Sequence, residues 1–421
     1  MSASWRRRVI FVITALSVFV TMAFLAGTFS VSETGKKKGP KRIVKDFSKE
    51  PVDKQMKNIR KTLKNLIEMR DTCQSPTDSS SCLSRAGGML WWVEKDPIVE
   101  EMTLHREPFG DYRLLSGRSS NEITELIHET LKQSEQLQEY LAKGRTILYQ
   151  GLEDHDIFYH VRMNASSPLS NAIMEFVKKH PNMYWLHWNP TFLDEQKGLL
   201  GPRVVPIPHF EGLVKDYEGK ADPVDQRTPD IAWRGATTGF FNPYTKSDRF
   251  RVVKAFDGVA GSDVKFSNRV QGVDNDVVPD SLMGGGMNEM KFANRRVVLD
   301  IDGNANAWEG LRWKLRLGAT IVKAKSIYYA QWYYPRMSHG KELWVADIDN
   351  IVAEAQKVAK DTKLAQRLAD NAYRFGQRHL TSEAIRNEIP KILGEVKAYA
   401  KSTDWRIRPF DEFELVPVQQ S

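Results

Sequence analysis

The stretch that decides the fold is VVLDIDGNANAWEGLRWKLRLGATIVK, residues 297–323. An apolar run reaches Asp300, a turn rich in Gly and Asn follows, and a helical pattern then leads to a second apolar run, ATIVK. A strand, a helix and a strand in this order predict a parallel pair with a crossover helix. The amino end of that helix offers backbone N–H groups to a diphosphate, and Arg312 and Lys314 add positive charge. An ordinary turn with two solvated basic residues explains the same pattern.

The alternation of short β-rich runs and helical patterns continues on both sides of this stretch. Before it come the runs TILYQ, MYWLHW, RVVPI and DIAWRG, with a helix over 172–179. A helix through Ala255 and the run VKFS precede it more closely, and two long helices are expected between 347 and 401. This order predicts parallel sheets, and therefore an α/β protein with two Rossmann-like halves facing a cleft.

An uncharged apolar run, VIFVITALSVFVTMAFLAGTFSV, occupies residues 9–31. About twenty such residues span a hydrocarbon core, whereas the apolar part of a cleavable signal peptide is usually about 7–15 residues long. A transmembrane helix is therefore predicted, with a cleavable signal as the alternative. The three arginines before it place the tail, residues 1–8, in the cytosol. Amphipathic helices are expected further on, over 53–70 and 121–143.

Composition excludes several classes of protein. The 421 residues are 41% hydrophobic and 27% charged, as in a globular protein of two domains. Much of the net charge of +8 flanks the apolar run, and no nucleic-acid motif accompanies it, so no nucleic-acid partner is expected. Cys73 and Cys82 lie in one short polar loop that can close a disulfide in an oxidising compartment, and their spacing does not indicate a zinc site.

The DIDGN turn permits two metal-binding interpretations. A calcium loop starting at Asp300 needs glycine at its sixth position and glutamate at its twelfth, where this chain has Ala305 and Leu311. Calcium is therefore not expected. Asp300 and Asp302 also match an Asp-x-Asp pair that holds Mg²⁺ or Mn²⁺ on a diphosphate. That interpretation ranks second, because basic side chains supply positive charge here without a metal.

A second polar segment, IAWRGATTGFFNPYTKSDRFR, occupies residues 231–251. A strand ends on Trp-Arg-Gly and enters a loop that contains Thr237 and Thr238. An arginine at the end of a strand, here Arg234, is well placed to hold phosphate or sugar oxygens. A purely structural arginine is the alternative.

Taken together, these motifs resemble the CAP10-like glycosyltransferases (glycosyltransferase family 90), which include the Rumi-type protein O-glucosyltransferases and the fungal capsule xylosyltransferases. The resemblance covers about residues 145–401. It rests on WRG followed by Arg249, on LDIDGN with LRWKL, on ATIVK, on QWYYPRM and on RFGQRHL, in this order and spacing. It implies a GT-B-like fold, UDP-glucose or UDP-xylose as donor, inversion in a single displacement, and no required metal or cofactor.

Site residues are carried over only where this chain matches the family's motifs. Arg312 matches the ligand of the donor diphosphate, and Arg234 matches the arginine of the aromatic-Arg-Gly motif. Thr237 stands where members often have a second arginine, and Gln331 stands where they have an acidic residue, so charge contacts at both places are in doubt. The expected donor-binding residues are Arg234, Thr237, Thr238, Arg249, Asp302, Gly303, Ala307, Trp308, Glu309, Gly310, Leu311 and Arg312.

The catalytic base has no direct match in the family's motif. Inverting transfer needs a group that takes the proton of the acceptor hydroxyl. Family members place an aspartate in the segment that resembles residues 149–190, but no carboxylate stands at the matching position. The nearest candidates are Asp156 and Asp154 in YQGLEDHDIFYH, and a plain acidic surface loop explains the same residues.

These expectations divide the chain into a cytosolic tail (1–8), a membrane anchor (9–31), a stem with a helix (32–85), an acceptor half (86–240), a donor half (241–405) and a tail (406–421). The predicted function is an inverting glycosyltransferase of the Golgi or endoplasmic reticulum membrane, with the catalytic region lumenal. It would transfer glucose or xylose from a UDP-sugar to a hydroxyl of a protein or glycan. The alternative is a membrane-anchored nucleotide-sugar or glycan-binding protein that has lost its catalytic base.

Overall fold

The computed structural model describes residues 52–71, 87–95, 100–110, 120–144, 146–151, 161–162, 165–194, 199–201, 203–209, 211–239, 243–307, 309–325 and 330–399. The predicted anchor at 9–31, the cysteines Cys73 and Cys82, and the candidate bases Asp154 and Asp156 lie outside these residues. Among the helices of the described part, none is both long and apolar enough to cross a membrane.

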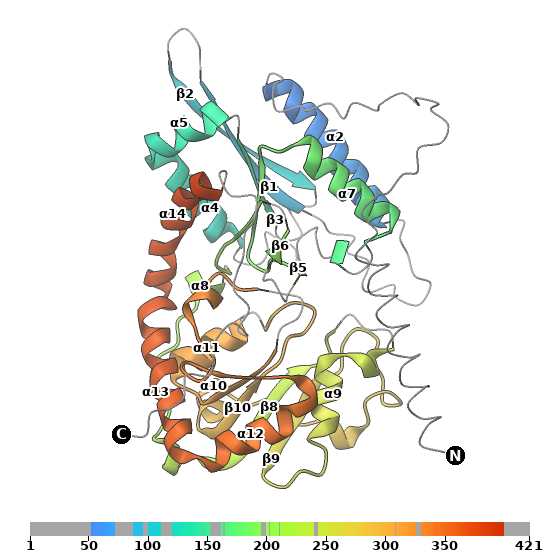
Figure 1. Cartoon of the computed structure of the whole chain (residues 1–421), viewed down its shortest axis with the longest axis vertical. Helices are drawn as coiled ribbons and strands as arrows, with labels where there is room; N and C mark the ends of the chain where they lie inside the picture. Colours follow the sequence, from blue (N-terminus) through green and yellow to red (C-terminus); the bar gives the residue numbers. More distant parts are fainter. Residues whose placement is uncertain are drawn as a thin grey trace, which may run out of the picture. The chain divides into compact units, whose positions relative to one another are not determined.

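A five-stranded parallel sheet is built from β8 (Thr228–Ala236), β9 (Ser262–Asn268), β10 (Arg295–Asp300), β11 (Ile321–Ala324) and β12 (Trp344–Ala346). Its strand order is β12-β11-β10-β8-β9, and every neighbouring pair is parallel (Figure 1). The four strands predicted from DIAWRG to ATIVK are confirmed. Because β8 pairs with β9 and β10, this second α/β unit begins by Thr228, upstream of the expected division at 241.

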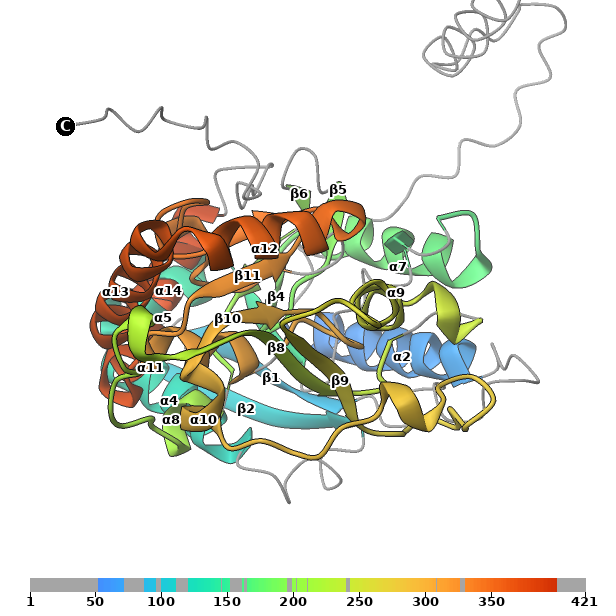
Figure 2. The ribbon, with the colours of Figure 1, turned by 90° about the horizontal axis from the view of Figure 1, so that it is seen from below.

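Side chains of the second sheet alternate between two apolar layers. Val297, Leu299 and Ile301 pack in the layer that contains α9 (Asp248–Ala255) and α12 (Ile351–Lys360). Val298 and Ile321 point to the opposite layer, with α11 (Glu309–Leu317) and α13 (Thr362–His379). Figure 2 shows α9 and α11 on opposite sides of β8 and β10. Burial on both faces explains why these strands are nearly continuous apolar runs.

Within the described residues, three α-helices rather than the two predicted follow β12. The chain breaks after α12 at Asp361, whose side chain accepts the backbone N–H of Leu364 at 2.9 Å and caps α13. It breaks again before α14 (Ser382–Tyr399). Within α13, a Cβ on Gly376 would lie 2.6 Å from the carbonyl oxygen of Leu315. The absence of a side chain there lets α13 and α11 pack backbone to backbone.

The first sheet contains β1 (Gly87–Lys95), β2 (Met102–Gly110), β3 (Ile147–Gly151), β4 (Met183–His187) and β7 (Val204–Pro206), in the order β2-β1-β3-β4-β7. The predicted strands β3, β4 and β7 are parallel. The expectation of purely parallel sheets is wrong for this half, because β1 and β2 form an antiparallel hairpin that was not predicted, and β1 pairs antiparallel with β3. A shorter antiparallel pair joins β5 (Phe192–Asp194) and β6 (Leu199–Leu200).

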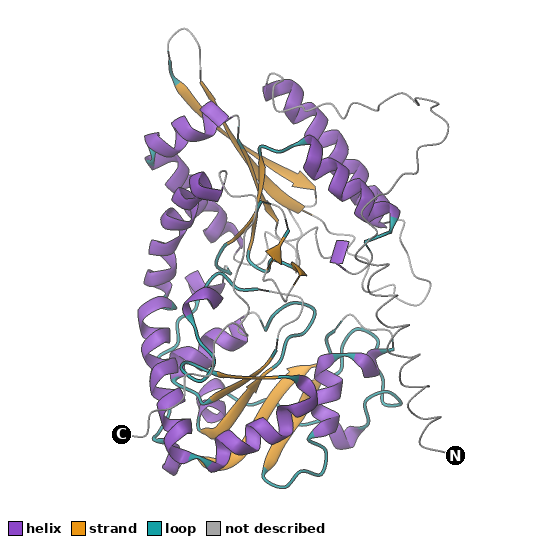
Figure 3. Ribbon diagram, viewed as in Figure 1, coloured by secondary structure: helices purple, strands orange, loops and turns teal. Residues whose placement is uncertain are grey.

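Helices around the first sheet are α2 (Val52–Asp71), α4 (Ser120–Gln133), α5 (Glu135–Gly144), α7 (Pro168–Lys179) and α8 (Glu211–Val214) (Figure 3). The single helix predicted over 121–143 is two helices, because the Ser134 hydroxyl accepts the backbone N–H of Leu137 and begins α5 there. Short helical segments complete the described elements: α10 (Glu289–Ala293), η2 (Val224–Gln226), η3 (Tyr244–Lys246), η4 (Asp280–Leu282), η5 (Tyr334–Arg336) and η6 (Ile348–Asn350).

The two sheets belong to one compact unit, Asp46–Ser421. The last helix, α14, packs on α4 and α8 beside the first sheet, and Arg386 of α14 lies 3.2 Å from Glu122 of α4. One hydrophobic core runs from the first sheet to the α11 side of the second. The C-terminal helix therefore ties the second α/β unit to the first.

Candidate functional site

The order of the second sheet places its topological switch point between β8 and β10. From β8 the chain moves to one edge strand, β9, and from β10 it moves the other way, to β11 and then β12. Open parallel sheets bind ligands at such a switch point, beyond the carboxyl ends of the strands. Here those ends continue into the loops 236–239 and 301–307. The sequence had marked both loops as polar segments.

Arg249, from the first turn of α9, joins these two loops. Its Nη1 donates to the Ala236 carbonyl at 3.0 Å and to the Thr238 hydroxyl at 2.5 Å. Its Nε donates to the Asp302 carbonyl at 3.1 Å. The guanidinium also lies over the ring of Trp233, 5.5 Å from its centroid. A single side chain thus holds together the loops that follow β8 and β10.

Gly303 lies in the tightest part of this junction. A Cβ there would be 2.5 Å from the Thr238 hydroxyl and 2.8 Å from the Arg249 guanidinium carbon. The next residue, Asn304, accepts the backbone N–H of Gly239 on its side-chain oxygen at 2.8 Å. The two loops are therefore interlocked, and a side chain at position 303 would have to displace Thr238 or Arg249.

A buried cluster of charged groups lies next to this junction. The Lys314 ammonium donates to one oxygen of Asp300 at 2.7 Å, and Lys323 donates to the other at 2.9 Å. Lys323 also donates to Asp302 at 3.0 Å. Burial alone would raise the pKa of Asp300, but the two lysines outweigh it and hold that pKa well below its usual range. Asp300 is therefore a carboxylate that accepts from two cations.

The metal-binding interpretation of Asp300 and Asp302 does not fit this geometry. Both oxygens of Asp300 already accept hydrogen bonds from lysine ammonium groups, and its side chain is fully buried. In the part of the chain that the structure describes, no three His, Cys, Asp or Glu side chains gather as metal ligands. Lys314 and Lys323 stand where a cation would have to bind.

Lys314 brings positive charge to the amino end of α11. Its ammonium lies 3.5 Å from the position that a Cβ on Gly310 would take, and Gly310 belongs to the first turn of that helix. The backbone N–H of Gly310 donates to the Ala307 carbonyl at 2.5 Å. The helix dipole and the ammonium therefore act at the same place, where an anion is favoured. Leu311, in contrast, points into the hydrophobic core, and Trp308 lies outside the described residues.

Arg312 faces away from the two loops. Its guanidinium donates to the carbonyls of Leu380 and Lys215 at 2.9 and 2.7 Å and to the carboxylate of Glu309 at 2.6 Å. It also lies over the ring of Tyr217. In this arrangement Arg312 and Glu309 tie α11 to the segment before β8 and to the end of α13. Its predicted contact with a diphosphate remains a prediction.

Arg234 and Thr237 also make bonds within the protein. Arg234 donates to the carboxylate of Asp263 at 2.6 Å and to the Gly285 carbonyl at 3.0 Å, on the β9 side of β8. The Thr237 hydroxyl is buried; it accepts the Val270 N–H at 2.7 Å and donates to the Val270 carbonyl at 3.1 Å. Of the predicted donor ligands, the structure brings together Thr238, Arg249, Asp302 and Gly303, with Ala307 and Gly310 following at the start of α11.

The carboxyl edge of the first sheet meets this site directly. The backbone N–H of Asn306, in the loop after β10, donates to the side-chain oxygen of Asn189, just beyond β4, at 3.3 Å. The Ala330 N–H donates to the Pro190 carbonyl at 2.9 Å. Gln331 is buried and donates to the Asn306 side chain, which in turn donates to the Ala330 carbonyl at 2.8 Å. The loops at the carboxyl ends of the two sheets therefore face each other.

Two histidines lie at this edge of the first sheet. His187 ends β4, and its Nδ1 accepts the backbone N–H of Asn189 at 3.1 Å. His209 follows β7 and packs edge-on against Trp188. Burial, with the charges of Arg312 and His187, lowers the pKa of His209 to about 3. His209 is therefore a neutral side chain at physiological pH.

Sequence analysis did not assign roles to Lys323, Asn189 or Asn306. Lys323 is a charged residue inside an otherwise apolar strand, TIVKA, and the preceding strand along the chain ends in Asp-Ile-Asp. Such a lysine needs a carboxylate partner when it is buried. The pairing of Lys323 with the Asp300 strand could thus have been predicted from the adjacency of the two strands.

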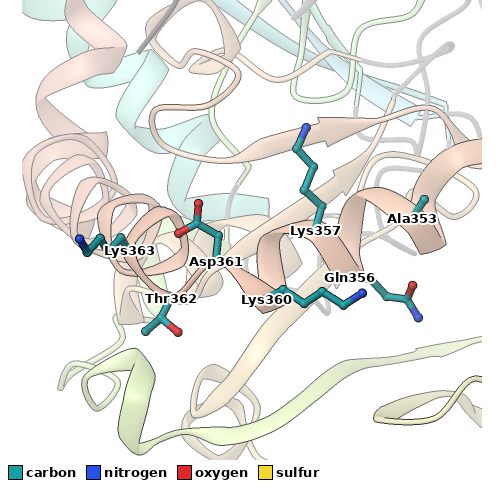
Figure 4. A pocket seen from close by; sticks show the side chains of 7 residues that line it. All are labelled: Ala353, Gln356, Lys357, Lys360, Asp361, Thr362 and Lys363. Atoms are coloured by element: carbon teal, nitrogen blue, oxygen red, sulfur yellow. The ribbon is translucent and has the colours of Figure 1, made fainter. Parts of the chain in front are cut away.

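A surface hollow elsewhere on the second unit does not resemble a binding site. It lies at the turn between α12 and α13 and is lined by Ala353, Gln356, Lys357, Lys360, Asp361, Thr362 and Lys363. Figure 4 shows its three lysines pointing in different directions rather than toward one point. The neighbouring Gln366 accepts the N–H of Val224, just before β8, so the hollow lies at the amino ends of the strands.

Comparisons with known proteins give distant likenesses. No protein-family model matches the sequence, and no curated protein does. Anabaena Alr3699/HepE in complex with UDP-glucose is 12% identical and overlaps 64% of this chain and 76% of its own, with a TM-score of 0.35. TarM is 11% identical over 45% of this chain and 39% of its own, with a TM-score of 0.32.

A third solved structure, the pneumococcal O-GlcNAc transferase GtfA in complex with UDP and GlcNAc, is 10% identical over 54% of this chain and 55% of its own, with a TM-score of 0.31. The chain spans about half the length of the HepE chains solved with UDP and glucose or with UDP alone, 56% and 50%. The structural likeness to these proteins is therefore partial.

Proposed function

We propose that the chain is a glycosyltransferase that binds a UDP-sugar at the switch point between β8 and β10 and transfers the sugar to a hydroxyl with inversion. The observation that carries the proposal is the interlocked junction of Thr238, Arg249 and Gly303 at the switch point of the second sheet. The amino end of α11, where the helix dipole is positive and the Lys314 ammonium lies close to Gly310, follows this junction along the chain. The sequence resemblance to CAP10-like enzymes and the GT-B-like division into two facing α/β units support the same assignment.

The electrostatics of the site suit a diphosphate. Arg249, Lys314 and Lys323 carry three positive charges, and Asp300, Asp302 and the neighbouring Asp248 are the acidic groups beside them, so the side-chain charges balance when Asp248 is ionised. The dipole of α11 adds positive potential at its amino end. Preorganised positive charge at this point would stabilise the UDP that leaves when the bond from the sugar to the β-phosphate breaks.

The transfer also requires a base on the acceptor side. The acceptor oxygen attacks the anomeric carbon, the bond to the β-phosphate oxygen breaks, and the base takes the hydroxyl proton. Asp156 and Asp154 remain the proposed bases. They follow β3 in the sequence, and β3 belongs to the parallel part of the first sheet, whose carboxyl edge meets the donor loops through Asn189.

The second candidate function is a nucleotide-sugar or glycan-binding protein without catalysis. It is favoured by the two positions where the chain departs from the family. Thr237 uses its hydroxyl to bind Val270, and Gln331 uses its amide to bind Asn306, so neither supplies charge to a donor. The membrane anchor at 9–31 and residence in the Golgi or endoplasmic reticulum are part of either proposal and rest on the sequence.

A donor panel separates the two functions. The full chain, purified in detergent, is titrated calorimetrically with UDP, UDP-glucose and UDP-xylose, and UDP release is then followed with protein and glycan acceptors, with and without EDTA. Binding with turnover that persists in EDTA supports the transferase. Binding without turnover across the acceptor panel supports the binding protein. A chain that binds none of these nucleotides contradicts both the transferase and the nucleotide-sugar-binding protein.

A further inference from the structure

The Lys323 ammonium connects two carboxylates, one at the end of β10 and one in the loop 301–307 (the donor loop). It lies 2.9 Å from Asp300 and 3.0 Å from Asp302. The side chains of Lys323 and Asp300 are fully buried, whereas the Asp302 side chain is 12% exposed. Burial by itself would lower the pKa of Lys323, but the carboxylate of Asp302, with Tyr334 and Asp300, raises it well above its usual value. The lysine is therefore a permanent cation of this turn.

This bridge holds Asp302 from one side while Arg249 holds it from the other. The Asp302 side chain accepts from Lys323, and its backbone carbonyl accepts from Arg249 at 3.1 Å. Gly303 follows directly, and its own N–H donates to the Ala305 carbonyl at 2.8 Å. Two cationic side chains therefore hold the backbone of this loop at Asp302: Lys323 through the carboxylate and Arg249 through the carbonyl.

The charge on Asp302 is unfavourable for the ligand that the site is proposed to hold. A carboxylate at the edge of a diphosphate site repels the phosphate oxygens. Among the described residues, the acidic side chains of Asp248 and Asp300 and the cations Arg249 and Lys323 lie near Asp302. An acidic residue is favoured here only if the Asp302–Lys323 ion pair improves diphosphate binding, by fixing the shape of the loop, more than the charge of Asp302 weakens it by repulsion.

We propose that Asp302 and Lys323 are positioning residues for the donor diphosphate: their ion pair fixes the Asp302–Gly303 turn in the conformation that binds UDP. This inference rests on the proposed function. It also makes a prediction opposite in sign to that of simple electrostatics. Removal of the Asp302 charge should raise the affinity for UDP if the carboxylate only repels the diphosphate. It should lower that affinity if the carboxylate positions the loop.

The test is calorimetric titration of the full chain with UDP, in the wild type and in Asp302→Ala and Asp302→Asn. Asp302→Ala removes the partner of Lys323 and should weaken UDP by about tenfold or more, as expected when a loop loses its binding geometry. Asp302→Asn keeps an oxygen that can accept from Lys323 and should lose less, on the order of threefold. UDP affinity that is unchanged or tighter in Asp302→Ala overturns the proposal, and Asp302→Asn decides in the same way if the alanine variant does not fold.

A matched control exists at the opposite edge of the same sheet. Asp230 at the start of β8 pairs with Arg295 at the start of β10, and both side chains are mostly buried. Asp230→Asn should lower the melting temperature without changing UDP affinity, and an equal loss of UDP affinity there would show that Asp302 acts only through stability. If wild type binds UDP and Asp302→Ala binds it equally well, the positioning role fails alone. If wild type does not bind UDP, the proposed function fails with it.

Discussion

Gly303→Ala is the substitution that tests the geometry of the switch point most severely. The added Cβ would be 2.5 Å from the Thr238 hydroxyl and 2.8 Å from the Arg249 guanidinium carbon. Thr238 cannot rotate away without losing its bond to Arg249, and Arg249 is held by the carbonyls of Ala236 and Asp302. The methyl group must therefore separate the two loops rather than displace a flexible side chain.

The expected cost of that separation follows from overpacking. Forcing a methyl group into a closely packed site costs about 1–3 kcal/mol. Each kcal/mol shifts the melting temperature of a domain of this size by roughly 2 °C or somewhat more, so a fall of about 2–6 °C is expected. UDP affinity should fall as well, by about tenfold or more, because the loop that is proposed to hold the diphosphate has moved.

Differential scanning calorimetry and UDP titration measure both effects on the same sample. Gly286→Ala is the matched control: it has no atom within 4 Å of its added Cβ and should change neither quantity. If Gly303→Ala melts at the wild-type temperature, the two loops are not packed around Gly303 as the structure shows. A stability loss with wild-type UDP affinity would refute the location of the donor site but not the packing.

Three further substitutions probe other parts of the structure. Burial, reinforced by Asp302, raises the pKa of Asp248 to about 6. Between about pH 4 and 6, Asp248 therefore keeps its proton in the folded state but has lost it in the unfolded state, so stability should fall as the pH rises through that window. Asp248→Asn should flatten the change in melting temperature with pH. Gly376→Ala places a Cβ 2.6 Å from the Leu315 carbonyl and should destabilise the chain by about 1–3 kcal/mol or more in denaturant titrations. Arg312→Ala leaves Glu309 buried without its cation and should cost about 3–5 kcal/mol; UDP affinity in the folded fraction then decides whether Arg312 also binds phosphate.

Much of the second sheet could be predicted because its strands are buried on both faces. Val297 to Leu299 form an apolar run for that reason, and the Gly- and Asn-rich turn shortly after them marked the candidate site loop. The β1–β2 hairpin was not predicted, and the antiparallel pairing of β1 with β3 is a long-range contact that local patterns do not indicate. The break at Ser134 was missed for a different reason, since the helical spacing of apolar residues continues on both sides of it.

The site was predicted at the level of segments and less well at the level of side chains. Arg234 stands at a strand end, as expected, but neighbouring strand residues point to opposite faces. Trp233 packs against Phe266, whereas Arg234 points to Asp263. On α11, Lys314 contacts Asp300 while Arg312, two residues earlier, turns toward Leu380. The face that each residue takes depends on tertiary packing, which spacing alone does not determine.

A crystal structure of the chain with UDP bound tests the proposed donor site most directly. The diphosphate is expected between the carboxyl ends of β8 and β10, within hydrogen-bond distance of the loop that contains Gly303 and of the first turn of α11. UDP bound elsewhere, such as at the turn between α12 and α13, or no bound nucleotide at millimolar concentration, would contradict it.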